Sequence, residues 1–145
     1  MAPSASSILA LDVGTIRIGI AIASVVVRLP RPLTTLANDE NFSTKLAEII
    51  KKEVVATVVV GLPRGLDGQE TGQTGYVRTF VANMPAELGV RMPFQDEALS
   101  SNRAKSELEA RGSAYQKGDI DALAATFILD DYLQANAAVS QVKDV

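Results

Sequence analysis

Two apolar segments near the start of the chain, separated by a short glycine-containing turn, constrain the fold more than any other feature. Residues 7–13 (SILALDV) form an apolar run with Asp12 near its end, and residues 18–23 form a second run. Gly14-Thr15 lies between the two runs and supplies a turn. The pattern predicts a β-hairpin in which Asp12 lies close to the bend.

The rest of the chain alternates between patterns typical of helices and of strands. Apolar residues recur at helical spacing over residues 41–53, and the β-branched run at 54–60, closed by Gly61, is typical of a buried strand. A helix followed by a buried strand predicts a parallel crossover. The other expected elements are strand pieces at 25–27 and 33–36 that Pro30 and Pro32 restrict to a sheet edge or bulge, a glycine-rich loop at 62–75, a helix from Tyr76 to Met84 that Pro85 ends or bends, a strand at 90–94, a helix at 100–111, and a last helix from Asp119 to about Asn136.

The length of 145 residues predicts a single α/β domain over residues 1–145, with a frayed tail after about Asn136. Hydrophobic residues make up 47% of the chain and charged residues 21%, which is a globular composition. No segment has the pattern of a signal peptide or approaches the ~20 apolar residues of a membrane span. We therefore expect a cytoplasmic protein that does not act on a membrane.

The chain contains neither cysteine nor histidine. The absence of cysteine excludes disulfides, thiolate nucleophiles, zinc ribbons and iron–sulfur clusters. The absence of histidine removes the commonest general base and metal ligand. Carboxylates, lysines, hydroxyls and bound metal ions remain to carry any chemistry at neutral pH.

Three acids that are far apart in the sequence, Asp12, Glu97 and Asp121, each lie at a strand end or a helix start. Singly, each has a structural alternative, because an acid can cap a turn, lie solvated in a loop or interact with a helix dipole. Asp96 competes with Glu97, but neighbouring strand residues face opposite ways, so only one can point into a site. Asp119 is placed to be the N-cap of the last helix, which leaves Asp121 for the site. Together the three acids predict a converging site for Mg²⁺ or Mn²⁺, which take oxygen ligands.

Four segments, in this order, resemble the motifs of the YqgF family of Holliday junction resolvases, also described as pre-16S ribosomal RNA nucleases. The segments are LALDVGTIRIGIAI at 9–22, VVVGLPRGLDGQET at 58–71, DEALS at 96–100 and KGDIDALAATFILDDYL at 117–133. The similarity extends from about Ile8 to Leu133. It implies a ribonuclease H-like α/β fold, with a mixed five-stranded sheet in which antiparallel hairpin strands precede parallel strands, flanked by helices.

The resemblance also implies an activity, which is metal-dependent hydrolysis of phosphodiester bonds in nucleic acid. The family's metal-binding acids map onto Asp12, Glu97 and Asp121. Two metal ions would activate a water and stabilise the leaving oxygen, so no protein nucleophile is needed. The residues expected to contact substrate are Thr15, Arg17, Arg64, Gly65, Ser100, Arg103 and Lys117.

The chain departs from the family pattern at two positions. Ala98 stands where the family usually has Arg, and Ile16 stands where a basic or polar residue is usual. Both changes weaken the expected phosphate contacts, for which Arg17 and Arg103 offer partial compensation, and leave the metal ligands in place.

Several functions remain open at this stage. The expected function is processing of the 5′ end of pre-16S ribosomal RNA, and the alternatives are resolution of branched DNA by a homodimer, action on single-stranded DNA, and non-catalytic binding of nucleic acid in ribosome assembly. A net charge of −3 and a pI of about 4.9 count against a generally basic nucleic-acid surface. The Asp-x-Gly-Thr segment at 12–15 also resembles the phosphate loop of actin-like ATPases, but those proteins need two such domains and a second phosphate motif.

Overall fold

The computed structural model describes residues 5–97 and 117–137 and contains one five-stranded sheet. The strands have the order β3-β2-β1-β4-β5, in which β1, β2 and β3 pair antiparallel and β1, β4 and β5 pair parallel. The elements are β1 (Ser7–Val13), β2 (Arg17–Ser24), β3 (Arg31–Ala37), α1 (Phe42–Glu53), β4 (Val55–Pro63), α2 (Gly72–Ala82), a 3₁₀ turn (Ala86–Leu88), β5 (Phe94–Glu97) and α4 (Lys117–Ala135). The predicted mixed α/β sheet with flanking helices is confirmed.

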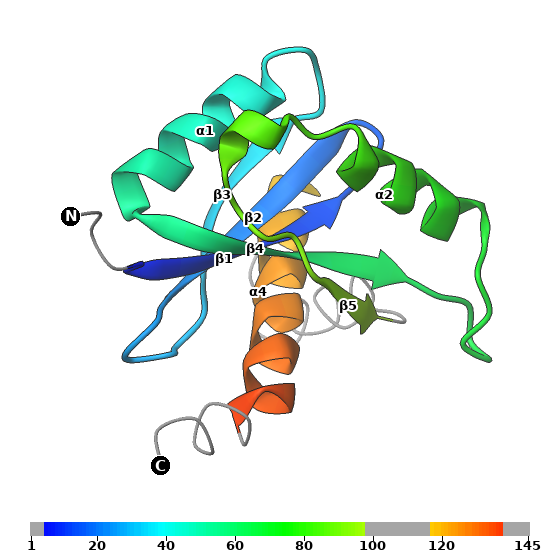
Figure 1. The fold of residues 1–145 in the computed structure, drawn as a ribbon. Helices are drawn as coiled ribbons and strands as arrows, with labels where there is room; N and C mark the ends of the chain where they lie inside the picture. Colours follow the sequence, from blue (N-terminus) through cyan, green and yellow to red (C-terminus); the bar gives the residue numbers. More distant parts are fainter. Residues whose placement is uncertain (1–4, 98–116, 138–145) are drawn as a thin grey trace.

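Helices cover both faces of the sheet, with α1 and α2 on one face and α4 on the other (Figure 1). Side chains alternate along β1, so that Leu9 and Leu11 enter the core beneath α1 and α2. The opposite face carries small residues, Ala10, Ala21 and Ala23, which pack against α4. Small side chains let a helix backbone approach a sheet closely, and this close approach positions the site. No helix in the described part of the chain is long and apolar enough to span a membrane.

The predicted hairpin is confirmed, whereas the strand piece predicted at 25–27 is wrong. Asp12 pairs with Gly19 and Val13 with Ile18 across the hairpin. Residues 25–27 form a turn, because Ser24 Oγ accepts hydrogen bonds from the backbone of Val26 (3.1 Å) and Val27 (3.2 Å). The third strand begins after this turn and lies at the sheet edge, as its proline requires.

The ends of several predicted elements also differ from the prediction. Strand β4 continues past Gly61 to Pro63, and β5 covers 94–97 rather than 90–94. Pro93 has no N–H to donate to the ladder, so only an isolated bridge between Thr57 and Arg91 precedes β5. Helix α2 begins at Gly72, four residues before the predicted Tyr76, because Thr71 and Thr74 form a capping box. The helix predicted at 100–111 lies outside the described residues.

Candidate active site

Asp12 and Asp121 come together because α4 lies directly on the sheet at a glycine. Gly19 is the pairing partner of Asp12 across the hairpin. A Cβ atom on Gly19 would lie 2.0 Å from the backbone oxygen of Asp121, a distance that only a glycine permits. The helix backbone therefore contacts β2 immediately beside Asp12. Ala10 and Asp12 alternate with Leu9 and Leu11, so the Asp12 side chain is on the face that α4 covers.

The surroundings of Asp12 perturb its carboxyl group. Burial, with a further contribution from the negative charge of Asp121, raises the pKa of Asp12 from 3.8 to about 7. Both causes disfavour a second negative charge at this point. Sites that bind cations or transfer protons often contain a carboxyl group that is half protonated near neutral pH beside a second carboxylate. A bound cation would therefore stabilise the ionised form of Asp12.

A cation from the protein itself already contacts one member of the pair. Arg17 Nε donates to Asp121 Oδ2 at 2.9 Å. The side chains are 36% and 21% exposed, so the ion pair is open to solvent on one side and an incoming cation or phosphate can reach it. Arg17 was predicted to contact substrate, and the structure places its guanidinium at the predicted metal site.

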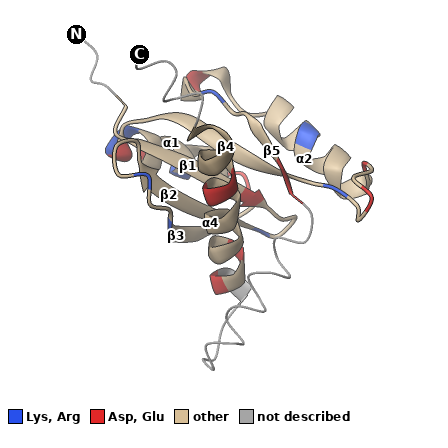
Figure 2. Ribbon diagram, turned by 90° about the horizontal axis from the view of Figure 1, so that it is seen from below, with Lys and Arg blue, Asp and Glu red and all other residues tan. Residues whose placement is uncertain are grey.

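Glu97 lies on the same face of the sheet as Asp12. The parallel pairing aligns Gly61 with Gln95 and Pro63 with Glu97, and Ile128 of α4 packs over Gly61. Glu97 therefore faces the α4 side, and its Oε1 atom is buried. Figure 2 shows acidic residues both on α4 and along β5.

Asp96 faces the other way. It aligns with Leu62, which belongs to the core under α1 and α2. Its Oδ1 atom accepts a hydrogen bond from Arg64 Nε at 3.2 Å. Within the described ranges, 5–97 and 117–137, no three Asp or Glu side chains lie close enough to hold one metal ion. The structure thus shows a close pair of carboxylates, with Glu97 further along the same face.

The predicted substrate residues have different surroundings. Thr15 is exposed in the hairpin turn, while Arg64 is engaged by Asp96 and by Glu70. The amide of Gly65 donates to the Gln69 carbonyl at 2.8 Å within the glycine-rich loop. Lys117 is the first residue of α4. Ser100 and Arg103 lie outside the described residues.

The prediction that Asp119 is an N-cap is wrong. Helix α4 begins two residues earlier than predicted, so Asp119 lies inside its first turn and is exposed. An acid in the first turn still interacts favourably with the helix dipole. The inward position of Asp121 is confirmed by its contact with Arg17 and its effect on Asp12.

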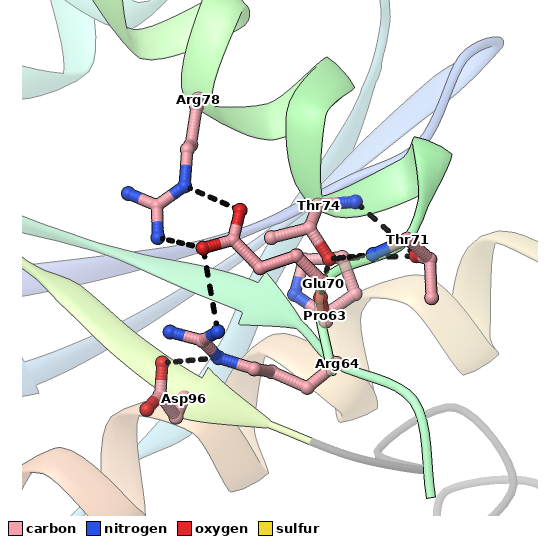
Figure 3. Close-up of polar contacts among 7 residues, drawn as sticks. All are labelled: Pro63, Arg64, Glu70, Thr71, Thr74, Arg78 and Asp96. Atoms are coloured by element: carbon pink, nitrogen blue, oxygen red, sulfur yellow. Dashed lines mark hydrogen bonds and ion pairs between the residues drawn. The ribbon is translucent and has the colours of Figure 1, made fainter. Parts of the chain in front are cut away.

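The sequence analysis missed two features. Gly19 was not singled out, although a glycine inside an apolar strand often marks a close backbone approach. Glu70 and Arg78 were also missed, and they form ion pairs that connect the glycine-rich loop to α2 (Figure 3). Their spacing of eight residues crosses a helix start, and no local sequence rule predicts such a contact.

Comparison with known proteins extends these observations. A family model described as "RuvX: Holliday junction resolvase" matches residues 6–135. A protein of Anaeromyxobacter sp. (strain K), named "Putative pre-16S rRNA nuclease", is 38% identical over 133 residues, which cover 89% of this chain and 97% of that protein. A protein of Sodalis glossinidius with the same name is also 38% identical, covering 90% of this chain and 96% of its own length.

Solved structures are similar in fold. The structure of T. thermophilus RuvC in complex with a Holliday junction substrate aligns with a TM-score of 0.56 and 17% identity, covering 90% of this chain and 96% of that chain. A second structure of Thermus thermophilus RuvC aligns with a TM-score of 0.53 and 16% identity. At these identities the likeness shows a shared ribonuclease H-like fold.

Proposed function

The chain belongs to the RuvX family, and from this premise we propose that it is a divalent-metal-dependent nuclease that hydrolyses phosphodiester bonds in pre-16S ribosomal RNA. The observation that carries the proposal is the close approach of Asp12 and Asp121, with the pKa of Asp12 raised to about 7. The RNA substrate is suggested by the names of the relatives, whose full length the chain nearly matches. We expect an activity on this substrate to be cytoplasmic.

The carboxylate pair fits a hard divalent cation. Mg²⁺ is usually held by one or two carboxylates together with waters and substrate phosphates rather than by a full protein cage. Asp12 and Asp121 supply two such carboxylates, and a divalent ion held by them would favour the ionised form of Asp12 against the burial and the repulsion that raise its pKa. Mn²⁺ satisfies the same requirement for oxygen ligands. A bound ion would supply a nucleophilic water and stabilise charge on the leaving oxygen.

The chain's own residues hold and orient the reacting groups. We assign Asp12 and Asp121 to the cation and Glu97, on the same face, to the third carboxylate position of the site. Arg17 neutralises Asp121 in the free protein and is placed to contact a phosphate once a cation occupies the pair. Thr15, in the exposed turn next to Asp12, is a further candidate for contact with the nucleic-acid backbone.

The test compares the wild type with Asp12→Asn on a panel of precursor ribosomal RNA, four-way junction DNA and single strands, with Mn²⁺ present. We expect the wild type to cleave the precursor RNA, and the variant to lose about 10³-fold or more of that activity, because a metal ligand is removed. Asp130→Asn is the matched control, since Asp130 lies further along α4 and its carboxylate accepts a hydrogen bond from Gln134 Nε2 (2.8 Å). It should cleave as the wild type does.

A second readout does not depend on finding the substrate. Mn²⁺ should stabilise the wild type by about 2.7 kcal/mol at a concentration 100 times its Kd, and should stabilise Asp12→Asn much less. Cleavage of the junction but not of RNA would reassign the substrate to branched DNA. Tight RNA binding without cleavage of any substrate, and without a Mn²⁺ effect on stability, would overturn the nuclease proposal and favour a binding role.

A further inference from the structure

A cluster of four charged residues, Arg64, Glu70, Arg78 and Asp96, joins the glycine-rich loop, α2 and β5 (Figure 3). We call this set the β5 clamp. It lies on the sheet face opposite the carboxylate pair, because Asp96 points to the side of α1 and α2. None of the four residues touches Asp12 or Asp121 through a contact found in the described residues.

Glu70 is the centre of the clamp. Its two carboxylate oxygens accept from Arg78 Nε at 3.0 Å and Arg78 Nη2 at 2.9 Å, which is the bidentate geometry that makes arginine–carboxylate pairs strong. Glu70 Oε2 also accepts from Arg64 Nη1 at 3.5 Å. The hydrogen bonds from Arg78, followed by the charges of Arg78 and Arg64, hold the pKa of Glu70 below its usual value. Glu70 thereby keeps two guanidinium groups side by side that would otherwise repel each other.

The two arginines in turn hold β5. Arg64 Nε donates to Asp96, and the backbone amide of Arg64 donates to the Glu97 carbonyl at 3.0 Å. The guanidinium carbon of Arg78 lies 5.5 Å from the centre of the Phe94 ring, within the range of a cation–π contact. Strand β5 has only four residues and pairs with β4 alone at the edge of the sheet, so these contacts add to the pairing that holds it.

The position of Glu70 is set by the start of α2. Glu70 directly precedes Thr71, the N-cap, whose backbone amide donates to Thr74 Oγ1 at 3.0 Å. Thr74 Oγ1 in turn donates to the carbonyl of Pro63, at the end of β4. The helix cap therefore anchors Glu70 next to the strand end from which Arg64 follows.

We propose that Glu70 is a positioning residue for the nuclease site, which acts through Arg64 and Arg78 to fix the end of β5 and hence the carboxylate of Glu97. The inference rests on the proposed function, in which Glu97 belongs to the site. Without Glu70, Arg64 and Arg78 repel each other and lose a shared partner. Their contacts with the short strand from Phe94 to Glu97 are then weakened. The Glu97 carboxylate then samples a wider range of positions, which weakens any cation site that it helps to form.

The test measures Mn²⁺ binding by calorimetry in the absence of nucleic acid, and the Mn²⁺ concentration that gives half-maximal cleavage. Glu70→Gln and Arg78→Gln should each weaken Mn²⁺ binding by about 3- to 10-fold. This is less than the 10- to 100-fold typical of groups that contact a metal-binding side chain directly. The melting temperature should fall by less than about 4 °C, because exposed ion pairs contribute little to stability. Asp130→Asn serves as the charge-matched control and should bind Mn²⁺ as the wild type does.

A double variant separates positioning from general damage. Glu97→Gln should weaken Mn²⁺ binding by itself, and adding Glu70→Gln should then have no further effect, because Glu70 acts through Glu97. Equal Mn²⁺ binding by Glu70→Gln and the wild type, with Glu97→Gln impaired, would overturn the positioning role and leave the proposed function standing. If Glu97→Gln itself bound Mn²⁺ normally, the assignment of Glu97 to the site would fail, and the role of Glu70 with it.

Discussion

The raised pKa of Asp12 predicts an unusual dependence of stability on pH. In the unfolded chain Asp12 loses its proton near pH 3.8, whereas in the folded protein it keeps the proton until about pH 7. Between these values the folded state binds more protons than the unfolded state, so the free energy of unfolding decreases as pH rises. Asp12 thus opposes folding above pH 7 and has no such effect below pH 3.8. Asp12→Asn removes this titration and keeps the size of the side chain.

The size of the effect follows from the two pKa values. The interval from 3.8 to about 7, at about 1.4 kcal/mol per pH unit, corresponds to about 4 kcal/mol. Asp12→Asn should therefore be more stable than the wild type by about 3 to 4 kcal/mol at pH 8, and the difference should fall toward zero at pH 4. Urea denaturation of both proteins at several pH values, with EDTA present to remove metal ions, measures this difference directly.

Subtracting the unfolding free energies of the two proteins cancels the titration of the other groups. The remaining pH dependence therefore belongs to position 12 and to its coupling with Asp121. A difference in unfolding free energy that stays constant from pH 4 to pH 8 would refute the reasoning, because the Asp12 carboxyl would then be neither buried nor affected by the charge of Asp121. In a parallel series without EDTA, Mn²⁺ at about 1,000 times its Kd should cancel this difference at pH 8, since binding then contributes about 4.1 kcal/mol to the protein that has its carboxylate ligand.

Two further predictions concern packing and charge at the site. Gly19→Ala should destabilise the protein by about 3 kcal/mol or more, because the new Cβ atom would meet the backbone of α4. Gly75→Ala, in open space on α2, should instead stabilise the protein by about 0.5 to 1 kcal/mol. Urea denaturation of the two variants tests both. Equal effects of the two substitutions would contradict the close contact at Gly19. Arg17→Gln should bind Mn²⁺ more tightly than the wild type when nucleic acid is absent, because Arg17 no longer competes for Asp121, and should cleave nucleic acid more slowly. Weaker Mn²⁺ binding by calorimetry would show instead that Arg17 orients Asp121 for the metal.

Hydropathy patterns predicted most of the individual helices and strands, whereas the mixed five-stranded sheet was implied by the resemblance to the YqgF family. The hairpin is an example, since two apolar runs around Gly14-Thr15 allow few other arrangements, and it placed Asp12 correctly on the strand. Predictions at the ends of elements were less accurate, because strand β5 depends on its pairing with β4 and on Pro93 rather than on its own composition. Its observed position puts Glu97 in the ladder, beyond the strand predicted at 90–94.

Contacts between distant side chains could not be predicted in the same way. The path of α4 depends on how small residues of the sheet match small residues of the helix, and no local pattern contains that information. The Glu70 contacts are equally non-local, since they require the turn of the chain before α2 and the position of β5 together. The sequence therefore predicted three candidate acids, and the structure was needed to show that Asp12 and Asp121 lie close enough to interact.

The approach of α4 to the sheet at Gly19 has two consequences of opposite sign. It buries the apolar residues between the helix and the sheet, which stabilises the fold. It also buries Asp12 and places Asp121 beside it, which destabilises the fold near neutral pH. Substitution of Gly19 removes both effects, whereas substitution of Asp12 removes only the second. If the contact existed only for packing, an uncharged residue at position 12 would serve better. A buried and mutually repelling pair of carboxylates at a well-packed contact is expected where the two groups bind a ligand. A divalent cation is the ligand that would offset the cost of burial and repulsion.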